Sequence, residues 1–296
     1  MIEFIKKRRL WYLISTVVIG IGIVAMIQNF RAFNHIFNMG IDFTGGSTMT
    51  LRFDSAPQQY ETRLREMFSS LGLKKLSIQT SGVGDILLKT QQVDVNVRNQ
   101  LFNAIKKEFG EFEVLEVDVI GPSIGEQLRK TSFIILISVA VAILMYCSWR
   151  FEFIFGISSI IALLHDALII LAMTALLKVE LSTAYIAALL TVLGYSINDT
   201  IVIFDRVREK MRMNDQEEFS KEVLNQAVNE MLPRSIHTSI STGIVVFSIF
   251  FFAGMSLKVF STVLIVGLIT GTYSSLFIAS PLLLTITKLR GGQVAR

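Results

Sequence analysis

The stretch GYSINDTIVIFDRVRE, residues 194–209, decides the fold class of this chain. It begins inside a long apolar run and ends in alternating charges, which is typical of a helix that leaves a membrane. Asn198 and Asp199 nevertheless lie inside it, and a charged side chain at the bilayer centre costs roughly 3 kcal/mol on insertion scales. Intramembrane carboxylates are usually functional, so we expect Asp199 to have such a role; the alternative is a buried hydrogen bond that only joins helices.

The two sides of this predicted helix differ in polarity. Helical spacing places Tyr195, Asn198 and Asp199 on one side. The opposite side is apolar, with Leu193 and Ile197 at its centre. One face is therefore suited to lipid or to packed neighbours, and the other presents polar groups.

The composition of the whole chain indicates a membrane protein. Of its 296 residues 52% are hydrophobic, and its mean hydropathy is +0.56. A transmembrane helix needs roughly 18–20 apolar residues, and six runs have about this length. These runs lie near residues 10–28, 131–149, 153–177, 181–204, 236–254 and 259–287. We therefore predict an α-helical polytopic membrane protein with six transmembrane helices.

The cysteine count and the motifs argue against several classes of site. The single cysteine, Cys147, excludes an intramolecular disulfide, and the spacing of metal ligands is absent. No nucleophile elbow is present, which leaves an intramembrane hydrolase built on Ser196 and His237 as a remote alternative. We predict that the protein is not an enzyme and has neither a cofactor nor a metal.

The distribution of Lys and Arg predicts the orientation. Basic residues are concentrated on one side of the predicted helices, in residues 6–9, 206–234 and 288–296. The short loops on the other side hold only Lys178 and Lys258. The positive-inside rule then places both termini in the cytoplasm. Residues 1–30 form the cytoplasmic N-terminus and the first membrane helix, and residues 290–296 form a cytoplasmic tail.

The segment 31–130, between the first two membrane helices, has the pattern of an α+β domain. Strand patterns at 47–53, 76–80, 85–89 and 112–120 alternate with helical stripes at 60–71 and 97–109. The order β-α-β-β-α-β predicts a ferredoxin-like extracytoplasmic domain that either binds and moves or serves only as a cap. Next, Pro122 and Gly125 in GPSIGEQL (121–128) predict a bendable linker, and we expect a hinge at residues 121–125.

The predicted membrane region, residues 131–289, contains further polar positions. His165 and Asp166 are adjacent, so helical geometry turns them about 100° apart and predicts that they contact different neighbouring helices. His165 is then structural, whereas Asp166 is either structural or part of a proton path. In the last run, Gly267, Gly271 and Ser275 allow close helix packing, and the Ser280-Pro281 pair should loosen the helix.

A second amphipathic pattern precedes the fifth apolar run. Residues 215–232 begin with a capping pattern and continue with an apolar stripe, which predicts an amphipathic helix on the cytoplasmic surface. Pro233 then suits the first turn of the fifth membrane helix. Arg234, His237 and Thr238 share one face of that helix, although an arginine at a helix end can also reach out to the membrane surface.

Five motifs, in this order, make the chain resemble the SecF family of the resistance–nodulation–division superfamily. They are GIDFTGG (40–46), GPSIGEQL (121–128), LLHD (163–166), GYSINDTIVIFDRVRE (194–209) and NEMLPRSIHTS (229–239). The resemblance implies a multi-pass subunit of the bacterial inner membrane with a periplasmic domain. Together with SecD it would use the proton-motive force to promote translocation of secreted proteins through and out of the SecYEG channel. The implied partners are SecD, SecYEG, YajC, the unfolded preprotein and membrane lipid, and no nucleic acid.

The same resemblance assigns a proton relay. The proton-linked acid of the family falls on Asp199 and its basic partner on Arg234. The supporting polar face comprises Tyr195, Ser196, Asn198, Asp166, His237 and Thr238. Independently, both relay residues lie near the cytoplasmic ends of their helices, at the similar depth that an ion pair requires. A pair that forms and breaks as Asp199 is deprotonated and protonated would provide a two-state element. The main alternative is half of a proton-coupled small-molecule transporter of the same superfamily.

Overall fold

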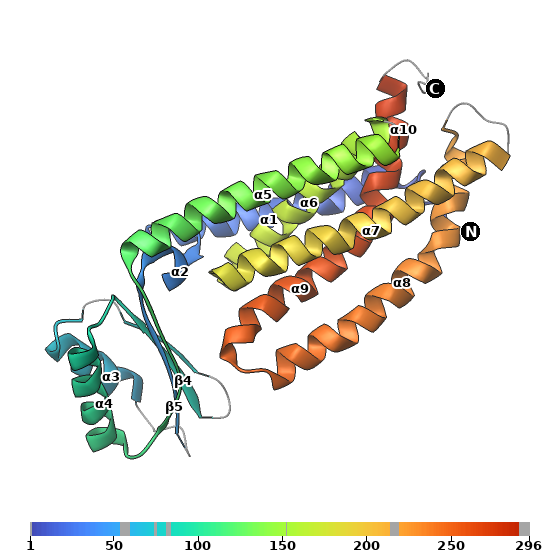
Figure 1. Ribbon diagram of the computed structural model, residues 1–296. Coiled ribbons are helices and arrows are strands. Elements are labelled where there is room, and N and C mark those ends of the chain that lie inside the picture. The colour runs from blue at the N-terminus through green and yellow to red at the C-terminus, as the bar shows by residue number, and fades with distance from the viewer. Residues whose placement is uncertain are drawn as a thin grey trace. The chain divides into compact units, whose positions relative to one another are not determined.

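The computed structural model describes residues 2–53, 60–73, 76–80, 84–151, 153–213 and 219–289. The chain divides into two compact units (Figure 1). One unit is helical and comprises Met1–Asn38 with Ile134–Arg296. The other is the α+β unit Met39–Phe133, and helix α5 is continuous between the two.

The helical unit confirms the prediction of six membrane-spanning helices. Its helices are α1 (Arg8–Phe33), α5 (Pro122–Arg150), α6 (Phe153–Leu177), α7 (Thr183–Met213), α8 (Lys221–Phe252), α9 (Met255–Ser274), the π-helix η1 (Ser275–Ala279) and α10 (Ser280–Leu289). Six segments of the described chain are long and apolar enough to cross a membrane, and the last, Leu257–Lys288, combines α9, η1 and α10. Two short strands, β1 (Asn38–Met39) and β6 (Glu180–Leu181), lie outside the helices.

Small residues allow the membrane helices to pack closely. A Cβ atom on Gly267 of α9 would lie 2.1 Å from Cγ2 of Val192 on α7, and one on Gly271 would lie 3.0 Å from Cβ of Ser196. These values leave no room for a larger residue at Gly267, so the predicted close approach of this helix is confirmed. The loosening expected at Ser280-Pro281 is also present, because the π-helix η1 ends directly before this pair. Proline has no N–H to donate and its ring crowds the preceding turn, so the helix widens there.

Helix α8 differs from the prediction. The described part of the amphipathic segment does not form a separate surface helix, because one helix runs from Lys221 to Phe252 with Pro233 inside it. Apolar side chains near the start of this helix, including Leu224 and Val228, are fully buried in the same cluster as Phe4 and Phe204. Packing against the protein thus replaces the expected contact with the membrane surface and keeps the helix continuous across the proline. Residues 215–218 of the prediction lie outside the described residues.

The α+β unit has the predicted ferredoxin-like topology. Its elements are α2 (Ile41–Thr44), β2 (Gly46–Arg52), α3 (Tyr60–Ser70), β3 (Leu76–Thr80), β4 (Asp85–Thr90), α4 (Val95–Phe109) and β5 (Glu113–Ile120). The sheet order is β3-β4-β2-β5 and every pairing is antiparallel, with Thr48 opposite both Lys89 and Asp118. Alternate residues of β2 and β4, such as Met49 and Leu88, form a buried core with Phe68 of α3 and Leu101 of α4.

The segment GPSIGEQL is not the linker that we predicted. Helix α5 starts at Pro122, where proline suits the first helical turn, and the N–H of Gly125 donates to the carbonyl of Gly121 at 3.0 Å. Gly45 adopts a φ of +72°, and a Cβ there would lie 2.9 Å from the Cα of Pro122. A Cβ on Gly125 would lie 3.0 Å from the amide nitrogen of Gly45. The two glycine-containing motifs therefore pack backbone against backbone, which is why glycine is required.

The sheet face opposite the α3–α4 layer carries charge. Lys89, on this face, is partly buried, and burial lowers the pKa of its ammonium group to about 8, although the carboxylate of Asp42 acts in the other direction. Burial, with repulsion from Glu116 and Asp42, raises the pKa of Asp118. This face is therefore sensitive to pH near the physiological range.

Candidate functional site

Asp199 occupies a buried position on α7 and has one hydrogen-bond partner. Its side chain is only 8% exposed, and the hydroxyl of Ser235 on α8 donates to Oδ1 at 2.9 Å. The second oxygen, Oδ2, is buried and has no partner among the described residues. Buried polar atoms are normally paired, so this oxygen marks a place where a proton can bind without breaking a hydrogen bond.

Arg234 lies beside this contact without joining it. It directly precedes Ser235 on α8, and in the described part of the chain no ion pair within 4.0 Å connects it to Asp199. Adjacent residues point about 100° apart on a helix, so when Ser235 faces Asp199 the guanidinium of Arg234 faces elsewhere. The two residues of the predicted relay are thus neighbours in depth, as expected, but are separated in this structure.

Arg234 is one of the residues that line a cavity of about 660 Å³ among α5, α7 and α8. Val202, three residues after Asp199 on α7, lines the same cavity. The cavity thus extends to within one helical turn of Asp199 along α7.

Tyr195 takes part in a hydroxyl chain that joins three helices. Its OH lies 3.1 Å from Oγ of Ser239 on α8, which in turn lies 2.5 Å from Oγ1 of Thr272 on α9. Sequence reasoning selected Tyr195 but missed Ser239 and Thr272. Ser239 lies four residues after Ser235, on the same side of α8, so helical spacing from the correct partner of Asp199 would have found it.

Three residues of the predicted polar face do not contact Asp199. Asn198 and His237 are exposed, and no hydrogen bond of either side chain occurs within the described ranges. The hydroxyl of Thr238 donates to the carbonyl of Arg234, one turn earlier on its own helix, at 2.9 Å. These residues, with Arg234, give α7 and α8 an exposed polar face.

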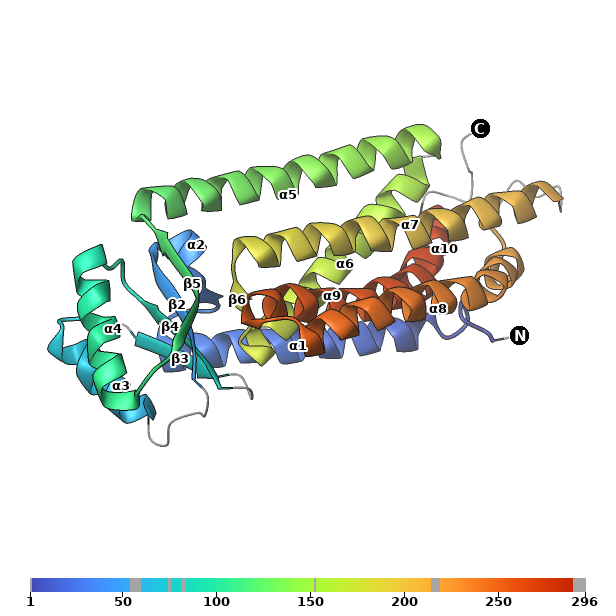
Figure 2. The same cartoon turned by 60° about the horizontal axis from the view of Figure 1, so that its bottom comes forward.

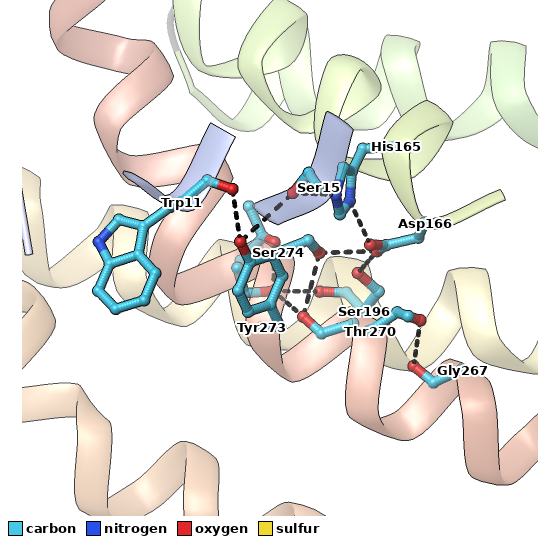
Figure 3. A network of polar contacts seen from close by, with 12 residues as sticks. Trp11, Ser15, His165, Asp166, Ser196, Gly267, Thr270, Tyr273 and Ser274 are labelled. Atoms are coloured by element: carbon cyan, nitrogen blue, oxygen red, sulfur yellow. Dashed lines mark hydrogen bonds and ion pairs between the residues drawn. The ribbon is translucent and has the colours of Figure 1, made fainter. Parts of the chain in front are cut away.

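Asp166 and His165 form the centre of a second, buried network (Figure 3). Nδ1 of His165 lies 3.1 Å from Oδ1 of Asp166, and its Nε2 lies 2.8 Å from the hydroxyl of Ser15 on α1. Oδ2 of Asp166 accepts from Ser196 of α7 at 2.6 Å and from Ser274 of α9 at 2.8 Å. The pair does reach different helices, as predicted. However, the two side chains also contact each other, which the 100° argument did not anticipate.

The environments of the two carboxylates differ in a way that separates their roles. Asp166 is fully buried and both of its oxygens are hydrogen-bonded, whereas Asp199 has one free oxygen. Ser196, another residue of the predicted supporting polar face, belongs to the Asp166 network. It is also far from forming a hydrolase pair, since it donates to Asp166 and no contact with His237 occurs in the described chain.

The hydroxyl of Ser275 connects the two carboxylate regions. Its Oγ lies 2.8 Å from Oγ1 of Thr200, the residue after Asp199, and donates to the carbonyl of Ser196 at 3.2 Å. Ser275 begins the π-helix η1, and π-helical turns often occur at functional sites. Ser275 was expected only to allow close helix packing, but its hydroxyl also makes these hydrogen bonds between helices.

The described residues contain no group of three or more His, Cys, Asp or Glu side chains that could hold a metal ion.

Comparison with known proteins gives consistent results. A family model described as "Protein export membrane protein SecD/SecF, C-terminal" matches residues 100–289, and a "SecD/SecF GG Motif" model matches residues 37–57. The protein translocase subunit SecF of Sebaldella termitidis is 35% identical over 98% of this chain and 93% of its own length. The SecF of Alicyclobacillus acidocaldarius is 36% identical over 95% of this chain and 91% of its own.

Solved structures show the same relationship. The crystal structure of SecDF from Thermus thermophilus matches with a TM-score of 0.85 and 31% identity over 97% of this chain. A second SecDF structure, described as a super-membrane-facing form, matches with a TM-score of 0.67 and 32% identity. This chain corresponds to 39% of the length of each of these SecDF chains.

Proposed function

The chain belongs to the SecD/SecF family of protein export membrane proteins, and we propose that it is a membrane subunit of the Sec protein-export machinery. With SecD as its partner, it uses the proton-motive force to promote translocation of secreted proteins through and out of the SecYEG channel. Support comes from relatives named protein translocase subunit SecF that align over more than nine tenths of both chains. YajC and the unfolded preprotein are further proposed partners.

The proposed partnership with SecD is supported by the exposed faces of α7 and α8. Thr191 and Asn198 on α7, and Arg234 and His237 on α8, are polar and exposed although they lie on helices that can span a membrane. Polar groups facing lipid are costly, so a partner with complementary groups stabilises them. The SecDF chains, of which this chain matches 39%, have the additional length that such a partner requires.

One observation supports proton coupling above all others, namely the buried carboxylate of Asp199 with its unpartnered Oδ2. Protonation at Oδ2 neutralises the side chain, and deprotonation restores a charge that Arg234 can approach if α8 rotates. An element with these two arrangements can convert proton movement into motion. Each proton that crosses 100 mV releases about 2.3 kcal/mol, which biases a two-state element almost fifty-fold.

The proposed orientation rests on the arrangement of the helix ends. In Figures 1 and 2, the starts of α1, α6 and α8 and the ends of α5, α7 and α10 lie at one end of the bundle. Basic residues, including Arg9, Arg150, Arg212 and Lys288, are found at these helix ends. The positive-inside rule then assigns this end to the cytoplasm. We propose that the α+β unit is periplasmic, in the bacterial inner membrane.

Cysteine labelling tests whether SecD covers the exposed polar face of α7 and α8. A single cysteine at Asn198, in a Cys147→Ala background, should react with a membrane-permeant maleimide when the chain is alone and be protected when SecD is present. A cysteine at the exposed Leu13 is the control, because this residue lies on α1 and not on the polar faces of α7 and α8. Equal labelling of Asn198→Cys with and without SecD contradicts the interface.

The reconstituted complex should also stimulate preprotein export only when a proton gradient is applied. The alternative, half of a small-molecule transporter, predicts gradient-driven efflux of a small solute without any effect on export.

A further inference from the structure

The arginine-lined cavity has a feature that proton coupling does not use. Its walls contain five arginines, namely Arg150 of α5, Arg206, Arg208 and Arg212 of α7, and Arg234 of α8. Among the described residues that line the same space, the carboxylates are Asp205 and Glu209, so this described lining has a formal charge of +3. A volume of about 660 Å³ lies within the range of roughly 300–1,000 Å³ that small-ligand sites occupy.

The existing contacts do not neutralise all five guanidinium groups. Arg206 is held by Glu209 and Glu230, and Lys210 also binds Glu230, so these four charges balance one another. Arg150 contacts Asp205 at 3.5 Å, the long end of an ion pair.

Within the described residues, the other three arginines have no carboxylate partner of their own. Arg208 donates to the carbonyl of Arg150 at 3.5 Å. Arg212 and Arg234 have no ion pair and donate no side-chain hydrogen bond within the described residues. Guanidinium groups bind phosphate oxygens with paired hydrogen bonds, so this surplus favours a phosphate-bearing anion.

The position of the cavity favours a phosphate on a lipid. The cavity follows α7 from Val202 to Met213, a length of about 16 Å at 1.5 Å per residue, and so extends from the apolar part of the helix to its charged end. Trp149, next to Arg150, is 85% exposed, as expected of an aromatic residue at the membrane interface. Val202, Met213 and Met231 add apolar surface to the walls, which suits the glycerol and upper acyl region of a lipid.

We propose that this cavity binds the headgroup of an acidic phospholipid through the arginines that have no carboxylate partner among the described residues. The bound phosphate offsets one of the three surplus positive charges of the cavity and gives Arg234 an anionic partner when that residue is not paired with Asp199. Lipid binding itself does not depend on proton coupling, so the two proposals can fail separately.

Lipid titration of the full chain in detergent, followed by native mass spectrometry, tests the site. Palmitoyl-oleoyl phosphatidylglycerol should bind at one tight site, and palmitoyl-oleoyl phosphatidylcholine should bind there much more weakly because its choline group opposes the arginines. Arg212→Gln should weaken the tight phosphatidylglycerol site about fivefold, since each basic residue near a membrane surface contributes about 1 kcal/mol. Arg9→Gln removes an exposed arginine of α1 at the same end of the bundle and should leave the affinity unchanged.

Two further measurements distinguish lipid binding from misfolding of the variant and from binding of a soluble anion. Arg212→Lys retains the charge and should keep most of the affinity, which guards against a loss that only reflects misfolding of Arg212→Gln. Inorganic phosphate should not displace phosphatidylglycerol at equal concentration. If it does, the site takes a soluble anion and the lipid assignment is wrong. Equal binding of the two lipids, or equal effects of Arg212→Gln and Arg9→Gln, overturns the proposal.

Discussion

Ser235 of α8 donates a 2.9 Å hydrogen bond to one oxygen of Asp199 on α7 and leaves the other oxygen without a partner among the described residues. This contact connects the two helices that carry the proposed proton relay. Because Arg234 is adjacent to Ser235, a rotation of α8 that brings the guanidinium toward Asp199 must also move the serine away. The two partners therefore compete for the same carboxylate.

Replacement of this serine tests the competition. Ser235→Ala removes a hydrogen bond to a group that is charged in part of the cycle, which is worth about 1.5–3 kcal/mol. Gradient-stimulated export should fall about tenfold or more, while assembly with SecD persists. Ser235→Thr keeps a hydroxyl and should retain most of the stimulation. If alanine and threonine behave alike, the hydroxyl does not contribute.

We expect Asp166 to stabilise the folded protein rather than to carry the proton. Asp166→Leu leaves His165, Ser196 and Ser274 without their acceptor, and each unsatisfied buried group costs about 1–3 kcal/mol. The thermal unfolding midpoint should therefore fall, which a thiol-reactive dye can follow because the only cysteine, Cys147, is buried. Asp166→Asn keeps an acceptor oxygen and should lose less. A stable Asp166→Asn protein that has lost all gradient stimulation would instead place Asp166 in the proton path.

The six membrane helices could be predicted from the sequence because hydrophobic length is a local signal. The ferredoxin-like topology followed from alternating patterns for the same reason. The continuity of α8 could not be predicted, because Pro233 and an amphipathic stripe are local evidence for a break. That evidence is outweighed by long-range burial of Leu224 and Val228 against the N-terminal segment. The start of α5 at Pro122 was missed because the glycines of its motif suggested flexibility, whereas they permit close packing.

Alanine substitutions at the packed glycines of the α+β unit should lower its stability by different amounts, in an order that the contacts predict. Gly45→Ala places a side chain on a backbone with φ of +72° and 2.9 Å from Pro122, so it should destabilise the chain most. Gly125→Ala brings its Cβ to 3.0 Å from Gly45 and should cost less. At Gly121 a Cβ meets nothing within 4 Å, so Gly121→Ala is the matched control. Unfolding midpoints in detergent should rank in this order, and a neutral Gly45→Ala would refute the packing explanation.

Lys89 should titrate near pH 8. Its pKa in the folded chain is about 8, below the ordinary value of about 10.4, so the unfolded chain binds more protons between these values. The free energy of unfolding therefore rises as pH increases from about 8 to 10.4, and the penalty is fully present below pH 8. NMR titration of the ¹³C-methylated full chain should show one lysine resonance with this midpoint, and Lys89→Arg should remove it. A spectrum in which every lysine titrates near 10 would contradict this.

In the candidate site too, the unusual residue could be identified from the local sequence, but its contacts with other helices could not. Asp199 stood out because a carboxylate inside an apolar run is anomalous by itself. Its hydrogen-bond partner in this structure, Ser235, was missed because the family resemblance directed attention to the neighbouring Arg234, and helical spacing alone could not fix the rotation of α8. Ser196 and Asp166 were both placed in the supporting polar face, but their direct hydrogen bond was not foreseen. Ser196 lies one turn from Asp199 on α7, but Asp166 reaches it from α6.

The central claim is that Asp199 carries the proton. Asp199→Asn keeps the size of the side chain but cannot ionise, so the complex with SecD should assemble and ATP-driven initiation should continue. Arg234→Lys keeps the charge without the planar guanidinium, and its export should be impaired but not abolished.

The most direct measurement is proton flux through the complex with SecD and SecYEG, reconstituted in vesicles with an applied gradient and a translocating preprotein. The wild type should show flux that rises with translocation, and Asp199→Asn should show none above protein-free vesicles. Glu126→Gln, the same loss of a carboxylate at an exposed position of α5 that pairs with Lys130, is the control and should retain the flux. Full translocation-linked flux in Asp199→Asn would show that Asp199 is structural and that the proton takes another route.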